Sequence, residues 1–153
     1  MWAIINGEER TGVTLFHFAD GVDDGDMIGQ KEFAVESTDT IREVLDKATR
    51  ATIEVVEEFL PRLADGTAPR IPQDLAKATV VPQRSPADGL IDWSWDPERI
   101  SNFIRAQTKP YPGAFTYIGD KRVTIWSADV VERTLVEGAA STIDQEVQPS
   151  QRP

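Results

Sequence analysis

The fold is decided by a short apolar run and the acidic loop after it: Gly12-Val13-Thr14-Leu15-Phe16-His17-Phe18, then Ala19-Asp20-Gly21-Val22-Asp23-Asp24-Gly25-Asp26. The apolar run is rich in β-forming residues, which predicts a buried strand. Two glycines and four carboxylates within residues 20–26 cannot easily continue that strand, so they predict a loop. Met27 to Val35 predicts a second strand. Residues 12–35 therefore predict two strands joined by a strongly polar loop.

A long amphipathic helix is predicted to begin at Thr40, because Thr40 and Glu43 have the spacing of a capping box. Asp65-Gly66 is predicted to end it, with glycine in a left-handed cap. The apolar residues at helical spacing are Ile41, Val44, Leu45, Ala48, Thr52, Val55, Val56, Phe59 and Leu63. We expect this face to pack on both strands through Ile41, Val44, Leu45, Val55 and Phe59.

The remaining residues predict a linker and a second, smaller unit. Residues 67–90 are rich in proline and suit a linker. Asp96 and Pro97 predict the start of a short helix, and residues 114–127 predict a hairpin that turns at Gly119-Asp120. Residues 134–153 lose periodicity and are expected to form a loose tail.

Composition limits the class of protein. The chain has 153 residues and no cysteine, which excludes disulfides, thiolate metal sites and cysteine nucleophiles. No run approaches the ~20 apolar residues that span a bilayer, so we expect a cytoplasmic protein without membrane partners. The formal net charge is −10, most of it in residues 1–75, and no basic stripe suggests nucleic-acid binding.

Three kinds of chemistry are compatible with the acidic loop. Asp20, Asp24 and Asp26 have a spacing somewhat like a calcium loop, but Lys31 stands where a glutamate ligand would be needed. The loop is also compatible with a solvated turn that has no role. A third interpretation is a carboxylate that orients a histidine for acid–base catalysis. The residue types alone leave the three open.

A series of short motifs resembles the formyltransferase family, in order, over residues 1–130. This family includes methionyl-tRNA formyltransferase and the sugar N-formyltransferases. The motifs are Asn6-Gly7-Glu8, Thr11-Gly12-Val13-Thr14, Gly21-Val22-Asp23-Asp24-Gly25-Asp26-Met27, Gln73-Asp74, Ala78-Thr79, Ile91-Asp92-Trp93, Ile104-Arg105-Ala106 and Pro110-Tyr111-Pro112-Gly113-Ala114-Phe115.

The resemblance implies an α/β fold: the C-terminal part of a Rossmann-like catalytic domain over residues 1–75, then a small open, OB-like β-barrel over residues 76–133. It implies 10-formyltetrahydrofolate as cosubstrate and no metal. The family uses an asparagine and a histidine in Asn-x-His, together with an aspartate that raises the histidine pKa. That aspartate matches Asp23, and the folate-contacting segment matches Ala19, Asp20, Gly21, Val22 and Asp23. The single histidine, His17, does not match the catalytic one.

The Asn-x-His motif of the family precedes the segment that matches this sequence. We therefore expect a truncated, catalytically incomplete form that is inactive alone and that a separate N-terminal half could complete. Lys109-Pro110-Tyr111-Pro112 resembles the enzymes that formylate an amino sugar nucleotide, including aminoarabinose formyltransferases. The alternatives are part of a methionyl-tRNA formyltransferase, with tRNA as partner, and a non-enzymatic accessory or vestigial module.

Overall fold

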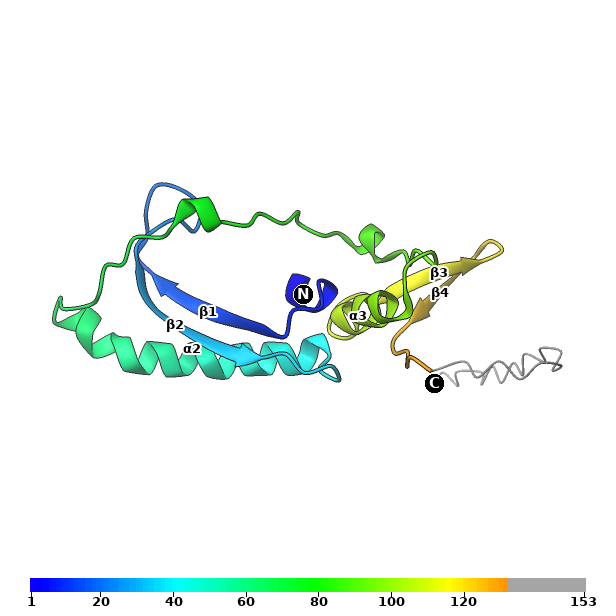
Figure 1. The fold of residues 1–153 in the computed structure, drawn as a ribbon, viewed down its shortest axis with the longest axis horizontal. Helices are drawn as coiled ribbons and strands as arrows, with labels where there is room; N and C mark the ends of the chain where they lie inside the picture. The colour runs from blue at the N-terminus through cyan, green and yellow to red at the C-terminus, as the bar shows by residue number, and fades with distance from the viewer. Residues whose placement is uncertain (132–153) are drawn as a thin grey trace, which may run out of the picture.

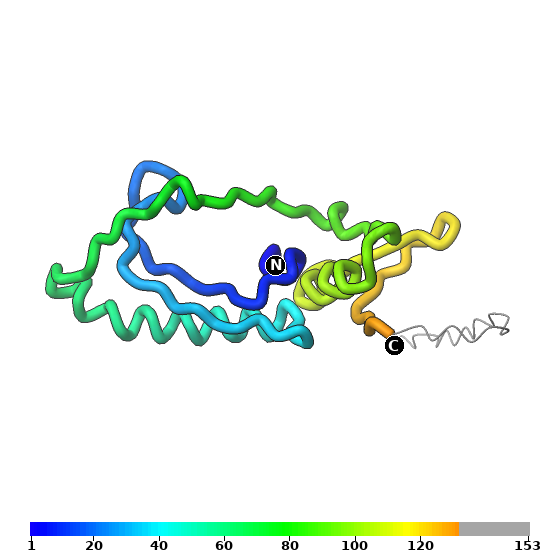
Figure 2. Tube along the Cα trace, in the orientation of Figure 1, coloured from blue at the N-terminus to red at the C-terminus, as the bar shows by residue number. Residues whose placement is uncertain are grey.

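The structure, a computed structural model, describes residues 1–131 and has an elongated outline (Figure 1). The predicted tail at 134–153 lies outside the described residues. The elements are the helices α1 (Trp2–Ile5), α2 (Ile41–Ala64) and α3 (Pro97–Gln107), and the strands β1 (Arg10–Phe16), β2 (Met27–Ala34), β3 (Ala114–Ile118) and β4 (Lys121–Ile125). Two short 3₁₀ helices, η1 (Leu75–Lys77) and η2 (Pro86–Gly89), interrupt the linker, which runs on the β1 side of the first hairpin (Figure 2). The α/β class is confirmed.

The first two strands form an antiparallel hairpin with one apolar and one polar face. Val13 pairs with Lys31 and Leu15 pairs with Gly29, and this face lies on α2. The ring of Phe59 occupies the space that a Cβ on residue 29 would need, at 2.3 Å, so glycine permits the close contact. The other face carries an Arg10–Glu32 ion pair. The prediction of a buried strand over 12–18 is therefore wrong in part: β1 is two residues displaced and only half-buried, because α2 covers one face alone.

The capping of α2 follows the prediction. The Thr40 hydroxyl accepts a hydrogen bond from the Arg42 amide at 3.2 Å, and the Glu43 carboxylate accepts one from the Thr40 amide at 2.9 Å. At the other end Gly66 has φ = +77°, the left-handed cap that favours glycine. These local signals fix both ends of the helix.

The apolar arc of α2 is wider than the hairpin that covers it. Ile41, Val44, Ala51 and Val55 are buried, whereas Leu45, Val56 and Leu63 are exposed. The expectation of one buried face is therefore wrong for four of the nine positions, because Thr52 is exposed as well. The physical reason is geometric: two strands are too narrow to cover both sides of the arc.

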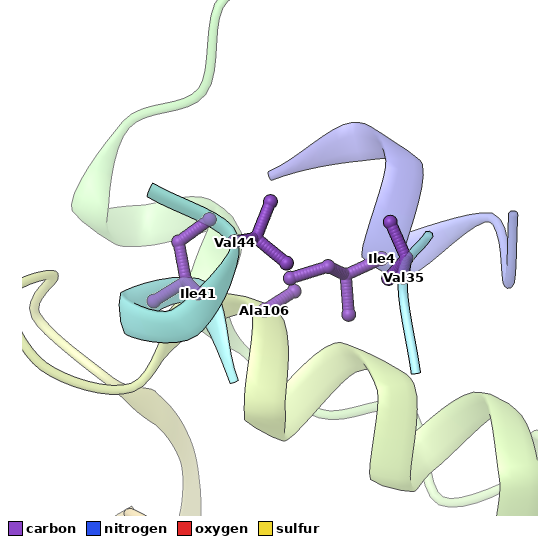
Figure 3. Packing of buried hydrophobic residues seen from close by; sticks show 5 residues of the cluster. All are labelled: Ile4, Val35, Ile41, Val44 and Ala106. Carbon is purple, nitrogen blue, oxygen red and sulfur yellow. The ribbon is translucent and has the colours of Figure 1, made fainter. Parts of the chain in front are cut away.

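One apolar cluster joins residues from distant parts of the chain (Figure 3). It contains Ile4 of α1, Val35, Ile41 and Val44 near the start of α2, and Ala106 of α3. Ile4 and Ala106 have no exposed surface. A second cluster around Phe103 and Ile104 continues from α3 to Ile91 and Ala114. The hairpin–helix unit and the α3 unit thus share packing through α1.

A polar network lies beside this packing. The buried Asp39 carboxylate accepts hydrogen bonds from the Lys47 ammonium at 2.5 Å and from the Glu36 amide at 2.8 Å. The Arg105 guanidinium of α3 donates to the Asp39 carbonyl at 2.6 Å and to the Glu36 carbonyl at 3.2 Å. The turn before α2 is therefore bonded to both helices.

The predicted β-barrel is not seen in residues 1–131. The β3 and β4 strands form a two-stranded antiparallel hairpin, and a single bridge joins Leu90 to Phe115. A barrel needs more strands to close than this hairpin provides. None of the described helices combines the length and apolar character needed to cross a membrane.

We expect Val55→Asp to destabilise the chain strongly and Val56→Asp to leave it almost unchanged. Val55 is 3% exposed and Val56 is 37% exposed, so the same change buries a charge at one position only. An unpaired buried carboxylate costs at least about 3 kcal/mol in the free energy of unfolding. Urea unfolding followed by circular dichroism measures both values, and equal stabilities would contradict the packing of α2.

We also expect Asp39 to make stability depend on acid pH. Burial raises the pKa of its carboxyl, but the hydrogen bonds from Lys47 and the Glu36 amide, with the charges of Lys47 and Arg105, outweigh burial and lower it. A lowered folded-state pKa contributes stability above the ordinary aspartate value of about 3.9, and this contribution is lost as pH falls through the folded value. Asp39→Asn should flatten the melting temperature against pH below about 4; an unchanged slope would contradict it.

Candidate functional site

The acidic loop joins the two antiparallel strands of the first hairpin. It begins at His17 and ends at Asp26, where the His17 amide donates to the Asp26 carbonyl at 2.9 Å. The sequence predicted a polar loop between two strands. In residues 1–131 it is the turn of a hairpin, so its position is set by β1 and β2 together.

The predicted site residues are contiguous and open to solvent. Ala19, Asp20, Gly21, Val22 and Asp23 are all exposed. Asp23 has φ = +54°, a left-handed conformation that aspartate and asparagine tolerate better than most residues. The exposed Asp23 carboxylate is therefore carried by a residue in the left-handed backbone conformation.

Close backbone packing explains the glycines. A Cβ on residue 25 would lie 1.7 Å from the His17 carbonyl oxygen, and a Cβ on residue 21 would lie 1.9 Å from an Asp24 carboxylate oxygen. Gly25 is buried against fixed backbone, so the loop cannot accept a side chain there without moving. Gly21 faces a side chain that can shift.

The linker holds the loop from outside. The Gln73 side-chain amide donates to the Asp23 carbonyl at 2.8 Å and to the Gly25 carbonyl at 2.7 Å. The Arg70 guanidinium lies 3.6 Å from the Asp26 carboxylate. The His17 ring nitrogen Nε2 lies 3.1 Å from the Pro69 carbonyl oxygen. Residues 69–73 thus fix both ends of the loop, and Gln73 is a positioning residue that sequence reasoning did not identify.

The middle of the loop keeps free backbone groups. Among the described residues, no backbone amide of residues 19–24 donates a hydrogen bond to another backbone group. Within the same part of the chain, no three carboxylate or histidine side chains converge as metal ligands would. The loop therefore offers exposed amides and carboxylates to a polar ligand.

An open groove of about 1050 Å³ lies elsewhere, between the turn before α2, α3 and the residues after β4. Its walls include Glu8, Glu36, Glu98 and Trp126, and the Arg105 guanidinium lies at its side. None of the loop residues 17–26 lines it. This groove and the predicted site are therefore different surfaces.

Two family models match the chain in order. The model described as "Formyl transferase" matches residues 1–60, and "Formyl transferase, C-terminal domain" matches residues 84–148. Together they cover most of the sequence.

Solved structures with the same fold include three relevant proteins. Methionyl-tRNA formyltransferase from Clostridium thermocellum is 25% identical, with a TM-score of 0.67 over 84% of this chain and 55% of its own. HypX from Aquifex aeolicus in complex with tetrahydrofolic acid is 24% identical, with a TM-score of 0.69 over 82% of this chain and 22% of its own. The N-formyltransferase from Helicobacter canadensis in complex with folinic acid and dTDP-3-aminofucose is 18% identical, with a TM-score of 0.69 over 93% of this chain and 52% of its own. The chain spans about half or less of each.

We expect Gln73→Leu to loosen the acidic loop, because two hydrogen bonds to its carbonyls are lost. Limited proteolysis between residues 18 and 25 should become several-fold faster, as local opening becomes less costly. Gln83→Leu in the exposed part of the linker is the matched control. Equal cleavage of the two variants would show that Gln73 does not hold the loop.

Proposed function

The chain belongs to the formyl transferase family, and we propose on this premise that it forms the C-terminal part of an enzyme that transfers a formyl group from 10-formyltetrahydrofolate to an amine. The observation that carries the proposal is that both family models match the chain in order. The acidic loop lies in the part of the chain that the first model matches, and Gln73 fixes this loop in place. The cysteine-free composition is in keeping with a cytoplasmic reaction.

The proposed cosubstrate fits the acidic loop. HypX holds tetrahydrofolic acid and the Helicobacter enzyme holds folinic acid, which supports a folate. A pterin ring presents hydrogen-bond donors and acceptors along one edge. The exposed segment Ala19–Asp23, with its free amides and carboxylates, provides complementary groups. These residues would hold the ring, and the folate would supply the formyl carbon.

The proposed acceptor is an amino sugar nucleotide. Support comes from dTDP-3-aminofucose bound to the Helicobacter enzyme and from Lys109-Pro110-Tyr111-Pro112, which resembles the sugar enzymes. The nearly balanced charge of residues 76–153 agrees, because tRNA binding favours clustered cations. Initiator tRNA is the alternative, since methionyl-tRNA formyltransferase is among the structural relatives.

We assign Asp23 a role in proton transfer. An amine that attacks the formyl carbon forms a C–N bond and a tetrahedral intermediate, and the bond to the folate nitrogen then breaks as a proton moves from the amine to that nitrogen. In the resemblance, a histidine moves this proton, and the Asp23 carboxylate stabilises its charged ring. The turned backbone at Asp23 and the Gln73 bond to its carbonyl would keep the carboxylate in position.

The competing function is a non-enzymatic accessory module. The observation in its favour is that the chain has one histidine, His17, whose ring lies against the Pro69 carbonyl rather than Asp23. Activity of the chain joined to a homologous N-terminal half that carries Asn-x-His separates the two functions. An accessory module would give no formyl transfer in that fusion.

We expect the fusion to be active and the 153-residue chain alone to be inactive. In the fusion, Asp23→Asn should lower turnover of 10-formyltetrahydrofolate with an amino sugar nucleotide by ~10²-fold. Asparagine keeps the size of the side chain and tolerates φ = +54°, so folding should be retained. Turnover by the unfused chain at the rate of the fusion would refute the proposal.

Asp24→Asn and Asp26→Asn are the matched controls within the same loop. Asp26→Asn weakens an exposed ion pair with Arg70, which contributes little to stability. Both should lower turnover much less than Asp23→Asn. If Asp26→Asn is inactive and Asp23→Asn is fully active, the assignment of Asp23 is wrong.

A further inference from the structure

The sequence has four steps at which glycine directly follows aspartate: Asp20-Gly21, Asp24-Gly25, Asp65-Gly66 and Asp88-Gly89. Such a step can rearrange without an enzyme, because the glycine amide nitrogen lies near the aspartate side-chain carbon and no Cβ hinders its approach. The reaction requires a free carboxyl group, a free amide and enough backbone freedom to bring the two together. The surroundings of each step therefore decide how fast it reacts.

Two of the four steps are held at the aspartate side chain. The Asp65 carboxylate accepts hydrogen bonds from the Thr67 amide at 2.9 Å and the Thr67 hydroxyl at 2.5 Å. The Asp88 carboxylate accepts them from the Ser85 amide at 2.6 Å and the Ser85 hydroxyl at 2.9 Å, and the following Gly89 is buried. Each carboxylate must give up two hydrogen bonds before it can react.

The third step, Asp24-Gly25, is held at the glycine. Gly25 is buried against the His17 carbonyl, and its own carbonyl accepts a hydrogen bond from the Gln73 side-chain amide at 2.7 Å. The peptide group that must rotate toward the Asp24 side chain is therefore packed on one side and bonded on the other.

A related asparagine step, Asn6-Gly7, would react in the same way with loss of ammonia. Its glycine amide donates to the Ile4 carbonyl at 3.0 Å, and the next amide, that of Glu8, donates to the Ala3 carbonyl at 2.9 Å. These bonds close the end of α1, so this step is held as well.

The step Asp20-Gly21 has none of these restraints. Both residues are exposed, and the linker bonds to the loop end on the carbonyls of Asp23 and Gly25. Within residues 1–131, the Gly21 amide and the Asp20 carboxylate take part in no hydrogen bond or ion pair. The close neighbour of Gly21 is the side chain of Asp24, which can shift.

We propose that Asp20-Gly21 is a self-modification site at which the chain converts aspartate into isoaspartate. The Gly21 nitrogen forms a bond to the side-chain carbon of Asp20, and the carboxyl hydroxyl leaves with the amide hydrogen as water. The product is a cyclic succinimide. A water molecule then breaks the bond between this nitrogen and the main-chain carbonyl carbon of Asp20. One water is released and one is consumed, so the composition of the chain is unchanged.

The product changes the acidic loop. The backbone now runs through the side-chain carbon of residue 20, which adds one methylene to the loop that carries Asp23, and the free carboxylate moves to the main-chain carbon. The inference goes beyond the proposed function and does not rest on it, because the rearrangement requires only the residues of the loop and water.

The test incubates the folded 153-residue chain at neutral pH and physiological temperature for several weeks. Peptides are then mapped by liquid chromatography and mass spectrometry, with fragmentation that distinguishes isoaspartate from aspartate. Isoaspartate should accumulate at residue 20 at least about ten-fold faster than at residues 65 and 88, because those two steps react only after local opening. In chain unfolded with guanidinium chloride, all four steps should react at similar rates.

Two variants sharpen the test. Asp20→Glu keeps the charge but needs a six-membered ring, so it should remove the rearrangement at residue 20 without changing the melting temperature. Gln73→Leu frees the Gly25 carbonyl and should speed the reaction at Asp24 several-fold while leaving Asp65 unchanged.

The inference is overturned if residue 20 in the folded chain reacts no faster than residues 65 and 88, or if the differences between the steps persist in the unfolded chain. An unchanged rate at Asp24 in Gln73→Leu would also contradict it, since restraint by the surroundings would then not set the rates. None of these measurements uses formyl transfer, so an inactive fusion would leave the assignment of Asp20 intact.

Discussion

The complete burial of Ile4 against Ala106 is the contact on which the arrangement of the chain depends. These two residues are about a hundred positions apart, and between them lie the hairpin, the long helix and the linker. Their packing with Val35 and Val44 brings α1, the start of α2 and α3 to one point. The Arg105 bonds to the turn before α2 then fix the direction of α3, since they end on two carbonyls of that turn. Without this contact, the β1–β2 hairpin and the β3–β4 hairpin would lose the shared apolar cluster that sets their relative position.

Whether a feature could be predicted from the sequence depends on how far apart the interacting residues lie along the chain. The capping of α2 by Thr40 and Glu43, the end at Gly66 and the turn at Gly119 are set by residues within four positions, and all were predicted. The half-burial of β1 and the exposure of Leu45, Val56 and Leu63 depend on how many strands cover α2, which no local pattern encodes. The resemblance likewise implied a small open barrel over residues 76–133, where the described residues form only the β3–β4 hairpin.

The acidic loop shows the same division. Its composition and its place after a β-rich run predicted a loop over residues 20–26, and the resemblance to a family implied residues 19–23 as the folate-contacting segment, but neither indicated how the loop is anchored. Gln73 acts from 50 positions away, and a lone glutamine in a proline-rich segment gives no signal of its own. The resemblance to a family did include Gln73 in a motif, without indicating that its amide bonds to the loop backbone. Whether Asp23 takes part in proton transfer remains a proposal.

Thr49 and Thr52, two exposed residues of α2 near the exposed Leu45 and Val56, have a consequence for the behaviour of the chain in solution. Since their hydroxyl protons are bonded within the helix, these two side chains offer water only acceptor groups. The surplus of carboxylates in the chain, with a net charge of −10, opposes association of these exposed apolar sides by long-range repulsion. Salt screens that repulsion over about 10 Å at 0.1 M and leaves the apolar attraction intact.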